Sequence, residues 1–180
     1  MTIVNPNHAE FKTQDAVSYN PVAQSFDRFV TQLSAPVAAR LVALAGLAPD
    51  NHVLDVGAGT GIVALRAVAE MGPSGRVVGI DLSDGMLEVA RQNARGRGLA
   101  DRVEFRKMDA ESLDCKDGSF DAVVSLFALR HFPHPETALQ EMHRVLRPGG
   151  RWVLAVGSGA PLLSLVGLVH RLKLLPHIVR

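Results

Sequence analysis

Residues 53–61 read Val-Leu-Asp-Val-Gly-Ala-Gly-Thr-Gly, and this stretch decides the fold. Its first half is typical of a buried strand, and its closely spaced glycines are typical of a tight turn. Residues 62–71, which follow, are rich in Ala, Leu and Val, with Arg66 and Glu70 at the spacing of a helix surface. The order strand, glycine turn, helix places backbone N–H groups at a helix N-terminus, where a ligand can approach closely.

The spacing of the glycines excludes two common kinds of nucleotide-binding loop. A dinucleotide-binding fingerprint has glycines at its first, third and sixth positions, but the sixth position counted from Gly57 is Ile62. A phosphate-binding loop is also excluded, because no lysine follows Gly61 directly. A nucleotide-type pocket of another kind and a purely structural glycine turn both stay open at this point.

Length and composition limit the class of protein. The chain has 180 residues, enough for one domain with a sizeable core, and a formal net charge of +1, which implies no strong field for nucleic acid or an anionic membrane. Residues 1–19 contain no apolar core of signal-peptide length. The single cysteine, Cys115, lies in a polar stretch and suits a reducing compartment. We therefore expect a cytoplasmic globular protein without a metal site.

Expected strands and helices alternate along the chain. Apolar runs without strict alternation, separated by helical patterns, predict a parallel sheet covered on both faces. The predicted fold class is therefore α/β, a Rossmann-like, doubly wound, mainly parallel sheet. The expected strands are residues 53–56, 76–81, 101–108, 120–127 and 151–156. The expected helices after the first strand are residues 62–71, a helix capped by Ser83, and residues 135–146, which end at a reversal over residues 147–150.

The two ends of the chain differ from this middle part. Residues 1–20 show little periodicity and are expected to form a loosely ordered arm. Apolar spacing predicts helices over residues 22–30 and 36–45, with Pro36 in the first turn of the second helix and Gly46 at its C-terminus. Residues 161–180 are strongly apolar but shorter than a membrane span. A helix covering the sheet, a substrate-side lid and a helix on a membrane surface stay open for them.

Three features come at the ends of expected strands, where parallel α/β sheets bind ligands. They are the glycine turn, Asp81 after the second strand and Asp109 after the third. Asp81 can accept hydrogen bonds from both hydroxyls of a ribose. Asp109 and the backbone of Ala110 can read the amino edge of an adenine, while Met86 can lie against the base. A ligand with a ribose and an adenine but no phosphate requirement fits this set, which indicates S-adenosylmethionine.

The sequence resembles the class I S-adenosylmethionine-dependent methyltransferases, in the small-molecule branch that includes the ubiquinone/menaquinone-biosynthesis methyltransferases. The resemblance covers residues 53–154. The segments that carry it, in the family's order, are V-L-D-V-G-A-G-T-G from Val53, V-V-G-I-D-L-S from Val77, M-D-A-E-S-L from Met108, F-D-A-V-V-S-L-F-A-L-R-H-F from Phe120 and E-M-H-R-V-L-R-P-G-G-R-W-V-L from Glu141.

The resemblance implies a cofactor site and a reaction. The reaction would be direct displacement of the methyl group from S-adenosylmethionine to a small-molecule acceptor, with S-adenosylhomocysteine as product. His131, just after the fourth strand, is the candidate general base, although a ring packed at the pocket rim stays open for it. The implied cofactor-binding residues are Asp55, Gly57, Ala58, Gly59, Thr60, Gly61, Asp81, Leu82, Met86, Asp109, Ala110, Ser125 and Leu126.

The resemblance also defines what this sequence lacks. Full class I domains add a helix and two strands after the fifth strand, which completes a seven-stranded sheet. Here one apolar segment follows, so we expect the C-terminal strands to be missing. The expected organisation is a cover of cofactor or substrate (residues 1–46), an S-adenosylmethionine-binding core (residues 47–160) and a truncated remainder (residues 161–180). Such a piece would bind the cofactor but turn over slowly.

The acceptor and two rival functions stay open. The fourth strand lacks the Asn/Asp-Pro-Pro-aromatic segment of enzymes that methylate nucleobase amino groups, so we expect a small molecule rather than a nucleic acid, and the Leu-rich tail favours an apolar one. A non-catalytic S-adenosylmethionine-binding module has the same sequence features. An NAD-dependent oxidoreductase is disfavoured by Ile62 and by the Asp109-Ala110 pair. Oligomeric state and the choice among O-, N- and C-methylation are open too.

Overall fold

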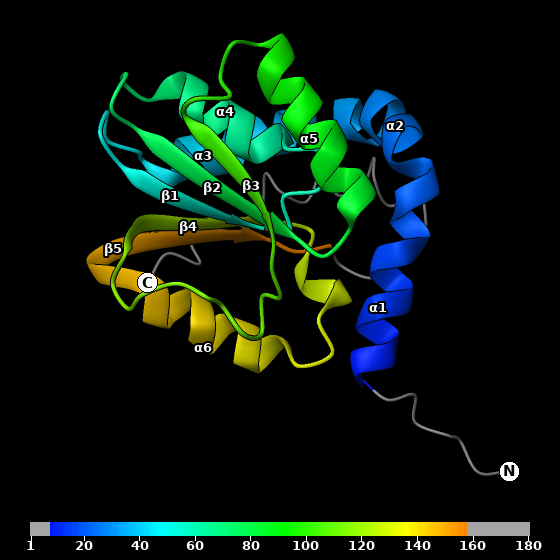
Figure 1. Ribbon diagram of the computed structural model, residues 1–180. Helices are drawn as coiled ribbons and strands as arrows, with labels where there is room; N and C mark the ends of the chain where they lie inside the picture. The colour runs from blue at the N-terminus through cyan, green and yellow to red at the C-terminus, as the bar shows by residue number, and fades with distance from the viewer. Residues whose placement is uncertain (1–7, 158–180) are drawn as a thin grey trace, which may run out of the picture.

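The chain forms a parallel sheet between two layers of helices (Figure 1). The computed structural model describes residues 8–157, and in this part of the chain the strand order is β3-β2-β1-β4-β5, with every neighbouring pair parallel. The predicted α/β, Rossmann-like class is confirmed. The strands are β1 (His52–Val56), β2 (Arg76–Asp81), β3 (Val103–Lys107), β4 (Phe120–Leu126) and β5 (Leu146–Ala155).

Helices cover both faces of the sheet, as predicted. One face carries α3, α4 and α5, and the other carries α6, while α1 lies beside the carboxyl ends of the strands (Figure 1). The predicted caps are confirmed: Gly46 ends α3 with φ 57°, and the Ser83 hydroxyl accepts the Met86 N–H at the start of α5. The helices are α1 (His8–Tyr19), α2 (Ala23–Phe26), α3 (Gln32–Ala45), α4 (Ile62–Glu70), α5 (Asp84–Gly96) and α6 (Pro135–Val145). The short turns are η1 (Asn20–Val22), the π-helical η2 (Asp27–Thr31) and η3 (Leu129–His131).

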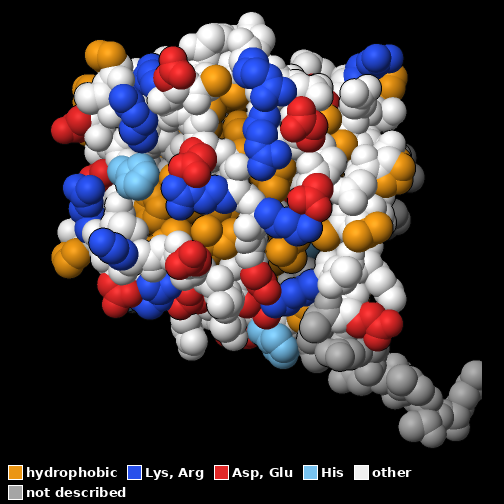
Figure 2. Space-filling view, viewed as in Figure 1, with side chains coloured by type: hydrophobic (Ala, Val, Ile, Leu, Met, Phe, Trp, Pro, Cys, Tyr) orange, Lys and Arg blue, Asp and Glu red, His pale blue; other side chains and the backbone are white. Residues whose placement is uncertain are grey.

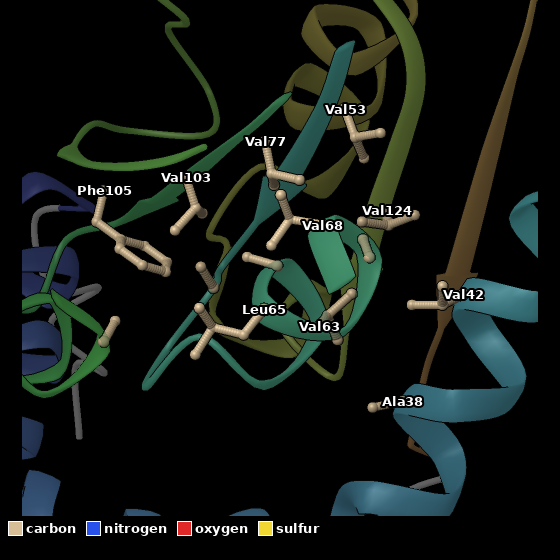
Figure 3. Close-up of a cluster of buried hydrophobic side chains, with 14 of the residues drawn as sticks. Ala38, Val42, Val53, Val63, Leu65, Val68, Val77, Val103, Phe105 and Val124 are labelled. Atoms are coloured by element: carbon tan, nitrogen blue, oxygen red, sulfur yellow. The ribbon is translucent and has the colours of Figure 1, made fainter. Parts of the chain in front are cut away.

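The apolar strands are buried on both sides. In one core, Val53 and Val77 lie with Leu65 of α4 (Figure 3). The neighbouring β1 residue, Leu54, belongs to the opposite core with Met142 of α6. Successive side chains of a strand point to opposite faces, so a strand covered by helices on both sides has no polar face. Each fully buried side chain of this size contributes roughly 1.5–3 kcal/mol to stability.

The expectation of a loosely ordered N-terminal arm is wrong for residues 8–20. Residues 8–19 form α1, which is polar around much of its circumference and therefore gives no apolar periodicity. Its contacts come from far along the chain: Lys12 pairs with Asp109, and Asp15 pairs with His131. The helix is therefore stabilised by tertiary ion pairs that no local pattern reveals.

The two separate helices expected over residues 22–30 and 36–45 are also corrected. The chain runs helically from Ala23 to Ala45, through the π-helical turn η2. Pro36 lies inside α3 and not in its first turn. Proline is tolerated best in a first turn, because the N–H that it lacks would have no helical partner there. The helix therefore begins one turn earlier than Pro36 indicates.

The expected reversal over residues 147–150 is a bulge within β5. Phe120 pairs with Leu146, and the next pair in register is Ala122 with Arg151. The intervening residues of β5 are therefore extra to the ladder, which resumes at Arg151, the first residue of the predicted strand. Bulges of this kind let a strand bend without ending.

Predictions for residues 161–180, as a covering helix, lid or membrane-surface helix, concern residues outside the described part of the chain. Within residues 8–157, no helix has both the length and the apolar character needed to cross a membrane. On the face shown in Figure 2, Lys and Arg side chains are interspersed with Asp and Glu. The exposed ion pairs of the described residues include Arg106–Glu104 and Lys107–Asp84.

The glycine turn between β1 and α4 requires glycine for different reasons at different positions. Gly57, Gly59 and Gly61 all have positive φ angles, of 72°, 54° and 89°. A Cβ on Gly57 would lie 2.2 Å from the Ala128 Cβ, and one on Gly61 would lie 2.8 Å from Cζ of Phe105. A Cβ on Gly59 would meet nothing within 4 Å. The outer glycines therefore allow close packing, whereas the middle one faces open space.

We predict that Gly61→Ala lowers the free energy of unfolding by about 1–3 kcal/mol, because it adds both left-handed strain and a clash with Phe105. The matched control is Gly96→Ala at the end of α5, where a Cβ meets nothing within 4 Å. There the added methyl group should stabilise the chain by up to about 1 kcal/mol. Urea unfolding of both variants checks this, and equal effects would contradict the packing role of Gly61.

Candidate functional site

A cavity of about 860 Å³ lies at the carboxyl ends of the strands. Its walls come from the glycine turn, the ends of β2 to β4 and the N-terminal helices. The structure brings together most of the predicted site residues here. Those that line the cavity are Asp55, Gly57, Ala58, Gly59, Thr60, Asp81, Leu82, Met86, Asp109, Ala110, Leu126 and His131.

Two predicted cofactor residues, Gly61 and Ser125, do not line this cavity. Gly61, the last glycine of the turn, lies against Phe105. Ser125 is 1% exposed, and its hydroxyl donates to the backbone oxygen of Val56, 2.7 Å away, which joins β4 to β1. In this structure both residues hold the scaffold of the cavity.

Asp81, at the end of β2, fixes the loops on either side of it. Its Oδ2 accepts the Gly59 N–H (2.9 Å) and its Oδ1 accepts the Ser83 N–H (2.9 Å). Burial raises the pKa of this carboxyl, and the backbone donors oppose that rise. A carboxylate has about four lone-pair sites, so Asp81 retains acceptor capacity for hydroxyl groups in the cavity.

Asp55, in β1, carries an unusual buried oxygen. The side chain is 1% exposed, and its Oδ2 accepts the Ala64 N–H at 3.0 Å. Its Oδ1 is buried and has no hydrogen-bond partner among the described residues. Burial raises the pKa of Asp55 to about 7. Buried polar atoms are nearly always paired, so a cationic or hydrogen-bond-donating ligand group fits beside this oxygen.

Asp109, which follows β3, is held from an unexpected direction. Lys12 of α1 places its Nζ 2.7 Å from Asp109 Oδ2 and 2.7 Å from Glu111 Oε2. Asp109 Oδ1 accepts the Glu111 N–H at 2.9 Å. Sequence reasoning missed Lys12, because a lysine in a polar segment without periodicity is indistinguishable from a surface residue.

His131 also contacts α1. Its Nδ1 lies 3.0 Å from Asp15 Oδ2, and its ring meets the Tyr19 ring edge-on, with centroids 5.7 Å apart. All three residues line the cavity. Sequence reasoning identified His131 but neither partner, since both precede it by more than a hundred positions.

Apolar side chains form another part of the wall. Phe26, Val30 and Leu33 come from the N-terminal helices, and Phe127 and Phe132 come from the segment after β4. Phe127 has a φ of 62°, a left-handed conformation that costs a non-glycine residue roughly 1–2 kcal/mol. Its N–H donates to the Ala155 oxygen at 2.8 Å. No sequence signal marks this residue, because phenylalanine does not favour that conformation.

The site holds carboxylates but no metal centre in the described residues. Within residues 8–157, no group of three or more His, Cys, Asp or Glu side chains is arranged to hold a metal ion. The carboxylates instead face backbone N–H groups, a lysine and a histidine. Their chemistry therefore suits an organic ligand with hydroxyl, amino and ammonium groups.

Comparisons with known proteins agree with this chemistry. The methyltransferase-domain family model matches residues 53–150. The chain is 40% identical over 137 residues to the ubiquinone/menaquinone biosynthesis C-methyltransferase UbiE of Ectopseudomonas mendocina. The matched residues make up 75% of this chain and 54% of that protein. The chain spans about half the length of the curated relatives it matches.

Solved structures are similar as well. The [4+2]-cyclase SpnF matches with a TM-score of 0.73 and 28% identity, over 79% of this chain and 59% of that one. The YcgJ protein of Bacillus subtilis matches with a TM-score of 0.64 and 31% identity, over 77% of this chain and 59% of that one.

We predict that Asp55 makes the ligand-free protein less stable as the pH rises. Its pKa is about 7 when folded against an ordinary 3.8, so the native state binds the proton more tightly than the unfolded chain. Stability is therefore lost as the pH rises from about 4 to about 7. A shift of this size corresponds to about 4 kcal/mol.

Asp55→Asn isolates this effect, because the amide oxygen still accepts the Ala64 N–H but does not titrate. Urea unfolding of both proteins between pH 4.5 and 8 should show a flatter profile for the variant. Parallel profiles would contradict the assignment.

Proposed function

This chain belongs to the class I S-adenosylmethionine-dependent methyltransferase family, and we propose that it transfers a methyl group from S-adenosylmethionine to a small-molecule acceptor. The observation that carries the proposal is the row of carboxylates along one cavity, Asp55, Asp81 and Asp109, each at or near the end of a different strand. Their spacing across β1, β2 and β3 suits an extended ligand with several polar groups.

Each part of the cofactor has a matching partner. Asp55 Oδ1, which lacks a partner within the described residues, accepts from the cofactor's ammonium group. Asp81 binds the ribose hydroxyls, and Asp109 with Ala110 reads the adenine. Met86, which is buried and lines the cavity, packs against the base. Gly59 supports this placement, because it leaves open space where any other residue would project a Cβ.

The protein's contribution to the reaction is alignment and exclusion of water. When bound, the cofactor supplies an activated methyl group on a cationic sulfur. The residues of this chain hold donor and acceptor in line, and the N-terminal helices cover them. A buried hydroxyl–hydroxyl hydrogen bond of 2.9 Å joins Thr31 of η2 to Thr60, and so links the N-terminal helices to the glycine turn.

The acceptor in this proposal is apolar and aromatic. Phe26, Val30, Leu33, Phe127 and Phe132 offer an apolar wall beside the carboxylates. The similar proteins named as ubiquinone/menaquinone biosynthesis C-methyltransferases support a quinol-type acceptor. The lone Cys115 supports a reducing, cytoplasmic location.

A non-catalytic cofactor-binding module is the second candidate. A fold does not determine a reaction, and the similar SpnF is named as a [4+2]-cyclase. The chain also spans only about half of its curated relatives. Cofactor binding without turnover would favour this candidate.

We predict that S-adenosylmethionine and S-adenosylhomocysteine stabilise the chain and that NAD does not. A ligand at about a hundred times its dissociation constant adds roughly 2.7 kcal/mol, which raises the Tm by roughly 5–10 °C at this length. Asp81→Ala should abolish the rise, whereas Asp84→Ala, which removes an exposed carboxylate paired with Lys107, should keep it. Thermal shifts of the three proteins check this. A rise with NAD alone would contradict the proposal.

We further predict that reduced 1,4-naphthoquinone is methylated and that an apolar tail on its ring lowers KM. Burial of each added methylene contributes about 0.8 kcal/mol, so a tail of a few carbons should lower KM at least tenfold. Formation of S-adenosylhomocysteine, followed by mass spectrometry, measures both. No product with any of these hydroquinones would favour the non-catalytic candidate.

A further inference from the structure

We propose that Asp15 is a positioning residue for His131: it holds the imidazole proton on Nδ1 and leaves Nε2 free to take a proton from the methyl acceptor. The inference rests on the proposed function and deepens it. It restricts the acceptor to compounds that lose a proton on methylation, such as a phenol, an enol or the ring carbon of a hydroquinone.

The geometry gives His131 two contacts from one helix. Asp15 Oδ2 lies 3.0 Å from Nδ1, and the Tyr19 ring stands at 80° to the imidazole. Asp15 and Tyr19 are four positions apart, so they lie on the same face of α1. The imidazole is therefore held in position and orientation by α1, although it belongs to η3, which lies far along the chain.

The hydrogen bond decides the tautomer. An ionised carboxylate only accepts hydrogen bonds, so a neutral imidazole reaches Asp15 only through an Nδ1–H group. The lone pair then lies on Nε2, which makes no hydrogen bond with any residue in 8–157. A histidine whose Nδ1–H is oriented by a carboxylate and whose Nε2 is free is the arrangement of a general base.

Charged groups of both signs line the cavity together with His131: Asp15 and Lys12 on α1, the adjacent Arg130, and Asp81 on β2, whose carboxyl interacts electrostatically with His131. As the acceptor's bond to the methyl carbon forms, the carbon–sulfur bond breaks and its electron pair stays on sulfur. The acceptor's proton passes to Nε2. The positive charge thus moves from sulfur to the imidazole, where Asp15 compensates it.

A purely mechanical role for Asp15, as an anchor of α1, is the alternative. The same helix has a second anchor in Lys12, which pairs with Asp109 and Glu111. Lys12→Met therefore loosens α1 while leaving the Asp15–His131 contact intact. A mechanical role predicts that loosening either anchor has the same effect on the His131 ring.

The first test measures the tautomer by ¹⁵N NMR of the histidine rings in the ligand-free full chain at pH 8. We expect Nδ1–H for His131 in the wild type and in Lys12→Met, both of which keep the Asp15 carboxylate beside Nδ1. In Asp15→Ala the ring should shift toward Nε2–H. An Nε2–H ring in the wild type would overturn the proposal, as would an unchanged ring in Asp15→Ala or a changed ring in Lys12→Met.

The second test measures kcat with reduced 1,4-naphthoquinone as acceptor. Asp15→Asn and His131→Asn should each lower kcat about 100-fold or more, because each removes the oriented base, with unchanged affinity for S-adenosylhomocysteine. A change in cofactor affinity alone would overturn the positioning role. Lack of any product in the wild type would instead contradict the proposed methyl transfer. The NMR result would still decide whether Asp15 holds the proton of His131 on Nδ1.

Discussion

Two carboxylates hold the glycine turn in place, and the cavity depends on them. Asp55 fixes the first turn of α4 through the Ala64 N–H, and Asp81 fixes the middle of the loop through the Gly59 N–H. The Gly57 and Ala58 N–H groups both donate to the Ile80 oxygen of β2. These bonds offset the left-handed backbone of the turn. They also aim the N-terminus of α4 at the cavity and leave one oxygen of Asp55 without a partner in the described chain.

The outer part of the cover, α1 and η1, is attached mainly by polar contacts. Asn20 Oδ1 accepts the Ser83 hydroxyl and the Gly85 N–H, each at 2.8 Å, and Lys12 and Asp15 reach across to the residues after β3 and β4. A hydrogen bond of this kind contributes only about 0.5–1.5 kcal/mol net, because water replaces it when it breaks. α1 and η1 can therefore separate from the sheet at lower cost than α3, whose Leu41 and Val42 belong to the main core. A site covered in this way admits a ligand without unfolding the core.

The sheet could be predicted from the sequence, whereas the helix α1 and its position could not. The residue types of the stretch from Val53 to Gly61 predict a strand and a turn that leads into a helix, and the later strands show the same apolar pattern. By contrast, α1 is polar, and its position depends on Asp109 and His131 far along the chain. Phe127 adopts a conformation that its residue type disfavours. The motif that predicts Ser125 at the cofactor also does not reveal that its hydroxyl bonds to the neighbouring strand β1.

The central claim is that one extended ligand, S-adenosylmethionine, lies along the three carboxylates. A crystal structure of the chain with S-adenosylhomocysteine tests it most directly. The account predicts the ribose hydroxyls on Asp81, the adenine beside Met86 and Asp109, and the ammonium group on Asp55 Oδ1. A ligand bound elsewhere, or one that leaves Asp55 Oδ1 without a partner, would contradict it.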